Sequence, residues 1–134
     1  MIEAVNRQRK RKIDTRAWET FAEQAASAIG HKESSATIAF VSDKAIRQLN
    51  RQFRGVDKAT DVLSFPAEDE TNLGDIAISV ETAAAQAKEN GLTFEGEVAQ
   101  LILHGLLHLS GYDHETDNGE MNRLELRLRK KLGI

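Results

Sequence analysis

Residues 93–114 read TFEGEVAQLILHGLLHLSGYDH, and this stretch decides the fold. Thr93 is a residue type that caps helix starts, and Gly111 is a type that ends helices. Between them, apolar side chains fall on almost every face of a helix; they are Val98, Leu101, Ile102, Leu106 and Leu109. A helix that is apolar on most faces is a buried one. The sequence therefore predicts a central helix around which the other elements pack.

The sequence on either side predicts a mixture of strands and helices. Runs of β-forming residues predict short strands at 1–5, 36–41, 61–65 and 75–79. The last two flank a polar loop, and we expect them to form an antiparallel pair. Capping residues followed by apolar residues at helical spacing predict further helices; these begin at Asp14 or Thr15, at Ser42, at Ser79 and, with Glu120 at capping-box spacing, at Asp117.

These elements show no regular βαβ repeat, so we expect an α+β fold: a small mixed sheet packed against several helices. Hydrophobic residues make up 40% of the 134 residues and charged residues 29%, as in ordinary globular domains. No apolar run approaches the roughly 20 residues that cross a bilayer, and the basic first segment lacks the apolar core of a secretory signal. The chain has no cysteine. We expect a single domain, residues 1–134, in the cytoplasm and without a membrane partner.

The charge is modest in total but unevenly distributed. The formal net charge is −3, yet residues 7–16 and 123–131 are strongly basic, whereas residues 57–100 hold ten acids and two bases. If the two basic segments met in the fold, they could follow a phosphate backbone. Alternatively, each basic patch offsets an acidic one on a solvated surface. The sequence leaves both possibilities open.

Three histidines dominate the chemistry of the central stretch. His104 and His108 are four residues apart, so they share one face of the predicted helix, and a turn at Gly111 could bring His114 beside them. Three imidazoles at one end of an apolar helix would be costly to bury without a cation. The spacing therefore predicts that His104, His108 and His114 bind one divalent ion. Zinc is our first choice, although imidazole also suits nickel, copper and iron.

Three nitrogen ligands leave one position open for water, the arrangement of catalytic rather than structural zinc. Gly105 stands where H-E-x-x-H peptidases have their glutamate base, which disfavours a peptidase, and we expect the glycine to leave space beside the metal. Asp113 is either a turn-forming residue or a support for an imidazole. Arg54 stands at the end of a predicted helix and Lys58 in the loop that follows; both suit phosphate binding, although by spacing alone Arg54 is more often a helix-end cation.

Together these motifs resemble the YbeY family of bacterial ribosomal RNA maturation endonucleases. The resemblance rests on HGLLHLSGYDH at 104–114, FRGVDKATDVLSFP at 53–66 and LGDIAIS at 73–79, and it extends in order over nearly the whole chain. Ala59 departs from the proline that is frequent in the family, which affects only the stiffness of the loop.

The resemblance implies a metal-dependent, single-strand-specific endoribonuclease that acts in small-subunit ribosomal RNA maturation and in ribosome quality control. The partners that it implies are single-stranded RNA, ribosomal RNA and the small subunit with its proteins. It makes His104, His108 and His114 the metal ligands, with His114 also catalytic. It gives Arg54 a role in RNA binding and catalysis, with Lys58 as a second substrate contact. Ser64 and Asp75 lie in family motifs, and we expect the LGDI strand to form a wall of the cleft.

Two other functions remain open from the sequence. One is a ribosome-assembly factor that binds RNA without cutting it and uses the metal only to hold the helix to its turn. The other is a metal-dependent hydrolase of another substrate, a peptide or a small phosphate ester.

Overall fold

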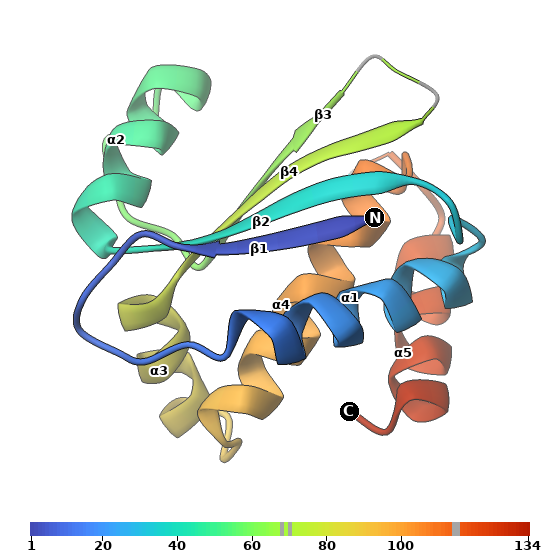
Figure 1. Ribbon diagram of the computed structural model, residues 1–134. Coiled ribbons are helices and arrows are strands. Elements are labelled where there is room, and N and C mark those ends of the chain that lie inside the picture. Colours follow the sequence, from blue (N-terminus) through green and yellow to red (C-terminus); the bar gives the residue numbers. More distant parts are fainter. Residues whose placement is uncertain (68, 70, 114–115) are drawn as a thin grey trace.

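The computed structural model describes residues 1–67, 69, 71–113 and 116–134. Over these residues the chain forms four strands and five helices, shown in Figure 1. In chain order they are β1 (Ile2–Asn6), α1 (Thr15–Ile29), β2 (Ser35–Val41), α2 (Asp43–Arg54), β3 (Val62–Pro66), β4 (Asn72–Ser79), α3 (Val80–Glu89), α4 (Phe94–Leu109) and α5 (Glu120–Leu132). The strands lie close to the predicted runs.

The sheet is mixed, as predicted. The strand order is β1-β2-β4-β3; β1, β2 and β4 run parallel, and β3 is antiparallel to β4. The predicted pairing of the two strands around the polar loop is therefore confirmed. Ile38 of β2 lies in register with Ala4 of β1 and Ile76 of β4, which places these side chains on one face of the sheet.

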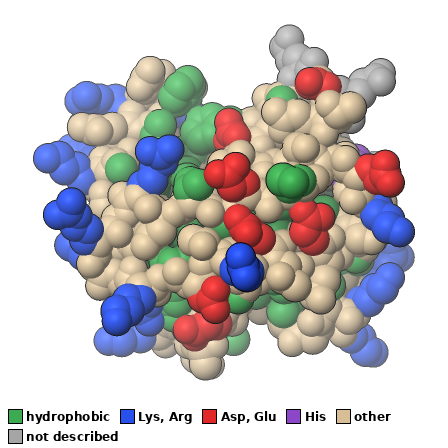
Figure 2. Space-filling view, in the orientation of Figure 1, with side chains coloured by type: hydrophobic (Ala, Val, Ile, Leu, Met, Phe, Trp, Pro, Cys, Tyr) green, Lys and Arg blue, Asp and Glu red, His purple; other side chains and the backbone are tan. Residues whose placement is uncertain are grey.

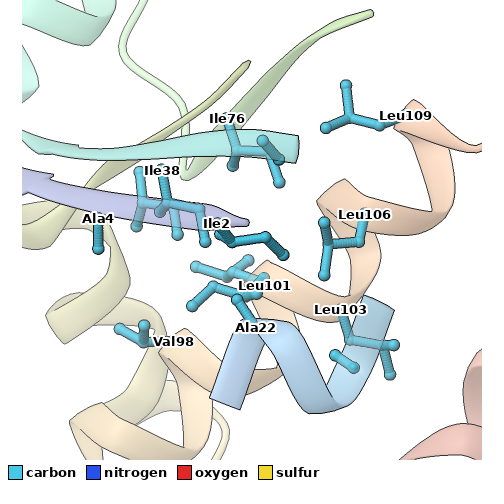
Figure 3. Packing of buried hydrophobic residues seen from close by; sticks show 14 of the residues in the cluster. Ile2, Ala4, Ala22, Ile38, Ile76, Val98, Leu101, Leu103, Leu106 and Leu109 are labelled. Carbon is cyan, nitrogen blue, oxygen red and sulfur yellow. The ribbon is translucent and has the colours of Figure 1, made fainter. Parts of the chain in front are cut away.

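That face is covered by α1 and α4, which cross beneath the sheet in Figure 1. The close view in Figure 3 shows Ile38 and Ile76 of the sheet pointing toward Leu101 and Leu106 of α4. All four side chains are buried in one continuous hydrophobic cluster. Helix α2 packs on the opposite face through a smaller cluster that includes Ile46. The expected α+β architecture and the central position of the apolar helix are confirmed.

Local signals explain where most helices begin and end. The Thr93 hydroxyl accepts a hydrogen bond from Gly96 N–H at the start of α4, and Ser42 and Ser79 cap α2 and α3 in the same way. The start of α5 differs from the prediction. Its cap position is Gly119, two residues later than Asp117, although the Asp117 carboxylate still accepts a hydrogen bond from Met121 N–H.

The two basic segments do not meet. Figure 1 places the loop after β1 and helix α5 on opposite sides of α1, and Figure 2 shows Lys and Arg side chains mainly at the two sides of this face, with acidic side chains along its middle. On the face shown in Figure 2, the two segments do not form one continuous basic track. Within the described part of the chain, no helix combines the length and apolar character needed to span a membrane.

Candidate active site

His104 and His108 lie on one face of α4, and their rings point toward each other. The two Nε2 atoms are 3.1 Å apart, and the ring centroids are 4.6 Å apart with the planes at 77°. Two imidazoles bound at 2.0–2.1 Å to one tetrahedral ion would hold their nitrogens roughly 3.3–3.4 Å apart. The observed separation fits a pair of ligands to a shared cation.

The second nitrogen of His104 is held by a residue that we did not predict. Nδ1 of His104 lies 2.8 Å from Oε1 of Glu125, whose side chain is only 6% exposed. Because an ionised carboxylate only accepts hydrogen bonds, Nδ1 carries the proton. In a neutral ring this leaves a lone pair on Nε2, the atom that faces His108. With its carboxylate ionised, Glu125 thus favours the His104 tautomer that a metal ligand would need.

Glu125 comes from α5, the last helix, where it lies on the buried face between Met121 and Leu128. The Arg129 guanidinium stands 3.8 Å from its other oxygen. Glu125 follows Met121 by four residues and precedes Leu128 by three, so it occupies a position on the apolar face of the helix where an acidic residue is unusual. That anomaly was the signal available in the sequence, but only the packing of α5 on α4 identifies the partner.

Gly105 has a different role from the one we predicted. A Cβ at this position would lie 2.9 Å from Cδ1 of Ile76 and 3.2 Å from its Cγ1. Residue 105 therefore faces β4 and not the histidine pair, so it does not provide space beside a metal. The missing side chain instead lets α4 approach the sheet closely. A glutamate base at this position would collide with the fully buried Ile76.

Arg54 lines the same groove as the two histidines. It ends α2, where Gly55 in the left-handed conformation (φ 70°) turns the chain toward β3. The buried Asn50 amide donates a 2.9 Å hydrogen bond to the Lys58 carbonyl and so holds the turn against α2. The groove has a volume of about 650 Å³ and is lined by Arg54, His104, His108 and Asp113, among others.

Ser64 also lines this groove, and its hydroxyl donates a 3.4 Å hydrogen bond to the Gly105 carbonyl. It therefore ties β3 to α4 directly under the histidine pair. The predicted cleft wall from the LGDI strand is wrong, since none of its residues lines the groove. Asp75 is exposed on the face of the sheet opposite α4, and Gly74 is required because a Cβ would lie 2.2 Å from the Phe65 carbonyl oxygen.

Lys58 lies apart from the histidines. It lines a separate groove of about 400 Å³ together with Arg47 and Asp57. Arg47 donates hydrogen bonds of 2.8 and 3.1 Å to Asp57, and this pairing holds the pKa of the Asp57 carboxyl below its ordinary value. Arg54, in contrast, makes no ion pair with any described residue. Of the two predicted phosphate contacts, only Arg54 shares the groove of the histidine pair.

The third predicted ligand, His114, lies outside the described residues. Within the described ranges, no group of three or more His, Asp or Glu side chains is arranged to hold a metal ion. The donor chemistry of the described pair nevertheless fits such an ion. Two convergent Nε2 atoms and a buried carboxylate on the far nitrogen of one ring form the usual surroundings of a metal-bound histidine.

Comparison with known proteins identifies relatives over the whole chain. A family model described as "Endoribonuclease YbeY" matches residues 3–133. The endoribonuclease YbeY of Nautilia profundicola is 55% identical over 94 residues, which cover 69% of this chain and 68% of that protein. The Solibacter usitatus protein of the same name is 56% identical over 92 residues, 69% of this chain and 62% of its own.

Two further relatives extend the match to nearly full length. The Geobacter metallireducens endoribonuclease YbeY is 38% identical over 141 residues, which cover 99% of this chain and 94% of that protein. A Thermotoga maritima protein solved in solution is 31% identical, with a TM-score of 0.70, covering 98% of this chain and 89% of that one. On this basis the chain belongs to the YbeY endoribonuclease family.

Proposed function

We propose that this protein is a metal-dependent endoribonuclease that cuts single-stranded RNA in the cytoplasm. Its role would be the maturation of small-subunit ribosomal RNA and ribosome quality control, in contact with the small subunit and its proteins. The observation that carries the proposal is the convergence of His104 and His108, with Nε2 atoms 3.1 Å apart, in a groove that also contains the guanidinium of Arg54, which makes no ion pair with any described residue.

We propose that His104, His108 and His114 hold one divalent ion, with zinc as the first candidate. When bound, such an ion would supply a Lewis acid for a phosphoryl oxygen and lower the pKa of a water molecule. The contact with Glu125 holds the His104 ring, and the burial of α4 along most of its length fixes the backbone that carries both histidines. The protein therefore presents the two described nitrogens in a preformed arrangement.

Glu125 orients the first of these ligands. Its carboxylate accepts the Nδ1 proton of His104 and keeps the Nε2 lone pair directed into the groove. The negative charge also makes the imidazole a stronger donor toward a cation. Because Glu125 belongs to α5, the site depends on the docking of the last helix, although the histidines themselves lie on α4.

Arg54 is placed to bind the phosphate. A guanidinium presents paired N–H donors that match two phosphate oxygens, and charge on those oxygens grows as the phosphodiester is cleaved. Arg54 and His108 line the same groove. Since no described carboxylate pairs with it, the guanidinium is available to a ligand. Lys58, in its separate groove, could contact the strand only farther from the reacting phosphate.

The packing at Gly105 argues against a peptidase of the H-E-x-x-H type. Ile76 occupies the space that a Cβ at position 105 would need, so this fold has no room for the glutamate base. A non-cutting assembly factor remains the rival that an experiment must separate.

The test is cleavage of an end-labelled RNA by the wild-type protein, a folded His108→Ala variant and a matched His31→Ala variant. His31 lies in the turn after α1 and lines neither the histidine groove nor the one that adjoins it. We expect the wild type and His31→Ala to cut single-stranded but not duplex RNA, and His108→Ala to be inactive. Equal cleavage by all three would contradict the proposal. A wild type that binds metal but cuts no RNA would favour the assembly factor.

A further inference from the structure

A second groove adjoins the first. It has a volume of about 710 Å³, and His104 and Asp61 line both grooves. We call it the amide groove, because Gln86, Asn90, Gln100 and Asn122 line it. It lies between α3, α4 and α5, and Figure 1 shows α3 and α5 on either side of α4.

One face of α4 forms the floor of both grooves. Glu97, Leu101, His104 and His108 follow one another at steps of three or four residues, so they lie along a single stripe of the helix. The distance from Glu97 to His108 along the axis is about 16 Å. A nucleotide whose phosphate lies at the histidine pair could place its base, but not the next phosphate, in the adjoining amide groove.

The charge of the amide groove excludes a phosphate. Four carboxylates line it, those of Asp61, Glu89, Glu97 and Glu125, against one guanidinium, that of Arg129, which faces Glu125. Such a surface repels anions and attracts hydrogen-bond donors. Within the described part of the chain, these acids do not form a group that could hold a metal ion. A neutral group rich in N–H donors suits this groove.

A nucleobase with an exocyclic amino group meets that description. Carboxylates accept hydrogen bonds from such amino groups, and side-chain amides bind base edges with a donor and an acceptor together. Leu92 and Leu101 add apolar surface for a base to contact. Uracil has one ring N–H donor between two carbonyl acceptors and no amino group, so binding it would bring a carbonyl oxygen to the place where cytosine offers its amino group.

We propose that the amide groove binds the base next to the cleaved phosphate and prefers amino-bearing bases over uracil. The proposal rests on the function proposed above, since RNA is the ligand. Cytosine and uracil provide the sharpest comparison, because the two rings have similar size and differ at C4, where an amino group replaces a carbonyl, and at N3, which accepts in cytosine and donates in uracil.

The experiment measures, by anisotropy, the binding of fluorescent 2′-O-methyl hexamers of cytidine and of uridine, in excess chelator so that no metal-dependent cleavage occurs. We expect the wild type to bind the cytidine hexamer at least about fivefold more tightly. Gln100→Ala and, separately, Gln86→Ala should reduce this ratio toward one. Gln24→Ala, on the exposed surface of α1, should leave it unchanged. Alanine is well tolerated in helices, so all three variants should fold.

Equal binding of the two hexamers by the wild type would overturn the proposal. A ratio of cytidine to uridine affinity that stays at the wild-type value in both groove variants would also overturn it. Cleavage of plain RNA hexamers is measured in parallel. If the protein cleaves RNA but binds both hexamers equally, only the proposed role of the amide groove is refuted. If it prefers the cytidine hexamer, loses this preference in the groove variants and cleaves no RNA, the proposed enzyme activity is refuted and the base-binding site is supported.

Discussion

Replacing Glu125 by glutamine should weaken metal binding without weakening the fold. The substitution keeps the side-chain length and one acceptor oxygen, but it removes the charge that lies 2.8 Å from Nδ1 of His104. Loss of a carboxylate partner behind a metal-bound histidine typically costs 10- to 100-fold in metal affinity. Because the glutamine oxygen can still accept the Nδ1 proton, we expect about tenfold, or about 1.4 kcal/mol. Glu125→Ala should approach 100-fold.

The same substitution should have little effect on the stability of the metal-free protein. Glu125 is buried at 5% exposure, and a buried charge carries a desolvation penalty that a neutral group of the same shape avoids. We therefore expect the free energy of unfolding of metal-free Glu125→Gln to stay within about 1 kcal/mol of the wild type. The two measurements are competition against a chromophoric zinc chelator and urea unfolding in excess chelator.

Glu95→Gln is the matched control. It also removes one negative charge, but Glu95 is exposed in the first turn of α4, about 14 Å along the helix from His104. Its metal affinity should equal that of the wild type. If Glu125→Gln bound zinc as tightly as the wild type and only lost stability, Glu125 would be a packing residue and our account of the His104 tautomer would be wrong.

Three further predictions concern packing, acid stability and the phosphate contact. Gly105→Ala should lower the free energy of unfolding in urea by up to about 2 kcal/mol, because an overpacking cost of about 1–3 kcal/mol against Ile76 exceeds the roughly 1 kcal/mol gained in helix propensity. Adding Ile76→Val to this variant should recover part of the loss. If the losses of the two single variants simply added in the double variant, the contact would be refuted. The Asp43 N–H, and then Lys10, hydrogen-bond the Glu81 carboxylate and hold the pKa of Glu81 below its ordinary value of 4.5. The stabilising contribution of Glu81 is thus complete above pH 4.5 and lost as the pH falls through the lowered pKa. Glu81→Gln should therefore make the free energy of unfolding decline less steeply at acid pH. If the decline were unchanged, other carboxylates would be responsible for it. Arg54→Ala should slow RNA cleavage by about 10²-fold or more and leave the zinc affinity unchanged. Arg54→Lys should recover only part of the rate, because lysine lacks the paired donors. If Arg54→Ala were fully active, Arg54 would have no role in cleavage.

The features that follow from local spacing were predictable from the sequence. The buried helix follows from apolar residues on all its faces, and the histidine pair follows from a spacing of four on that helix. Strand positions and the antiparallel pair followed from short β-forming runs around one polar loop. In each case the responsible interactions are local, either within one helix or across one hairpin between Val62 and Ile78.

The features that depend on packing between distant segments were not predictable. Glu125 lies 21 residues after His104, and only the docking of α5 on α4 brings them together. We expected Gly105 to leave space beside a metal, but which neighbour a side chain at position 105 would meet depends on how α4 packs on β4. Arg54 and Lys58 are four residues apart, yet the left-handed turn at Gly55 directs them into separate grooves.

The measurement that tests the account most directly is a metal titration of RNA cleavage. Protein stripped with a chelator is given zinc in steps, and cleavage of a labelled single-stranded RNA is measured at each step for the wild type and for His114→Ala. We predict no cleavage without metal, a linear rise that ends at one equivalent for the wild type, and no rise for His114→Ala. Cleavage that is independent of added metal, or equal in the two proteins, would contradict the claim that the three histidines form the catalytic metal site.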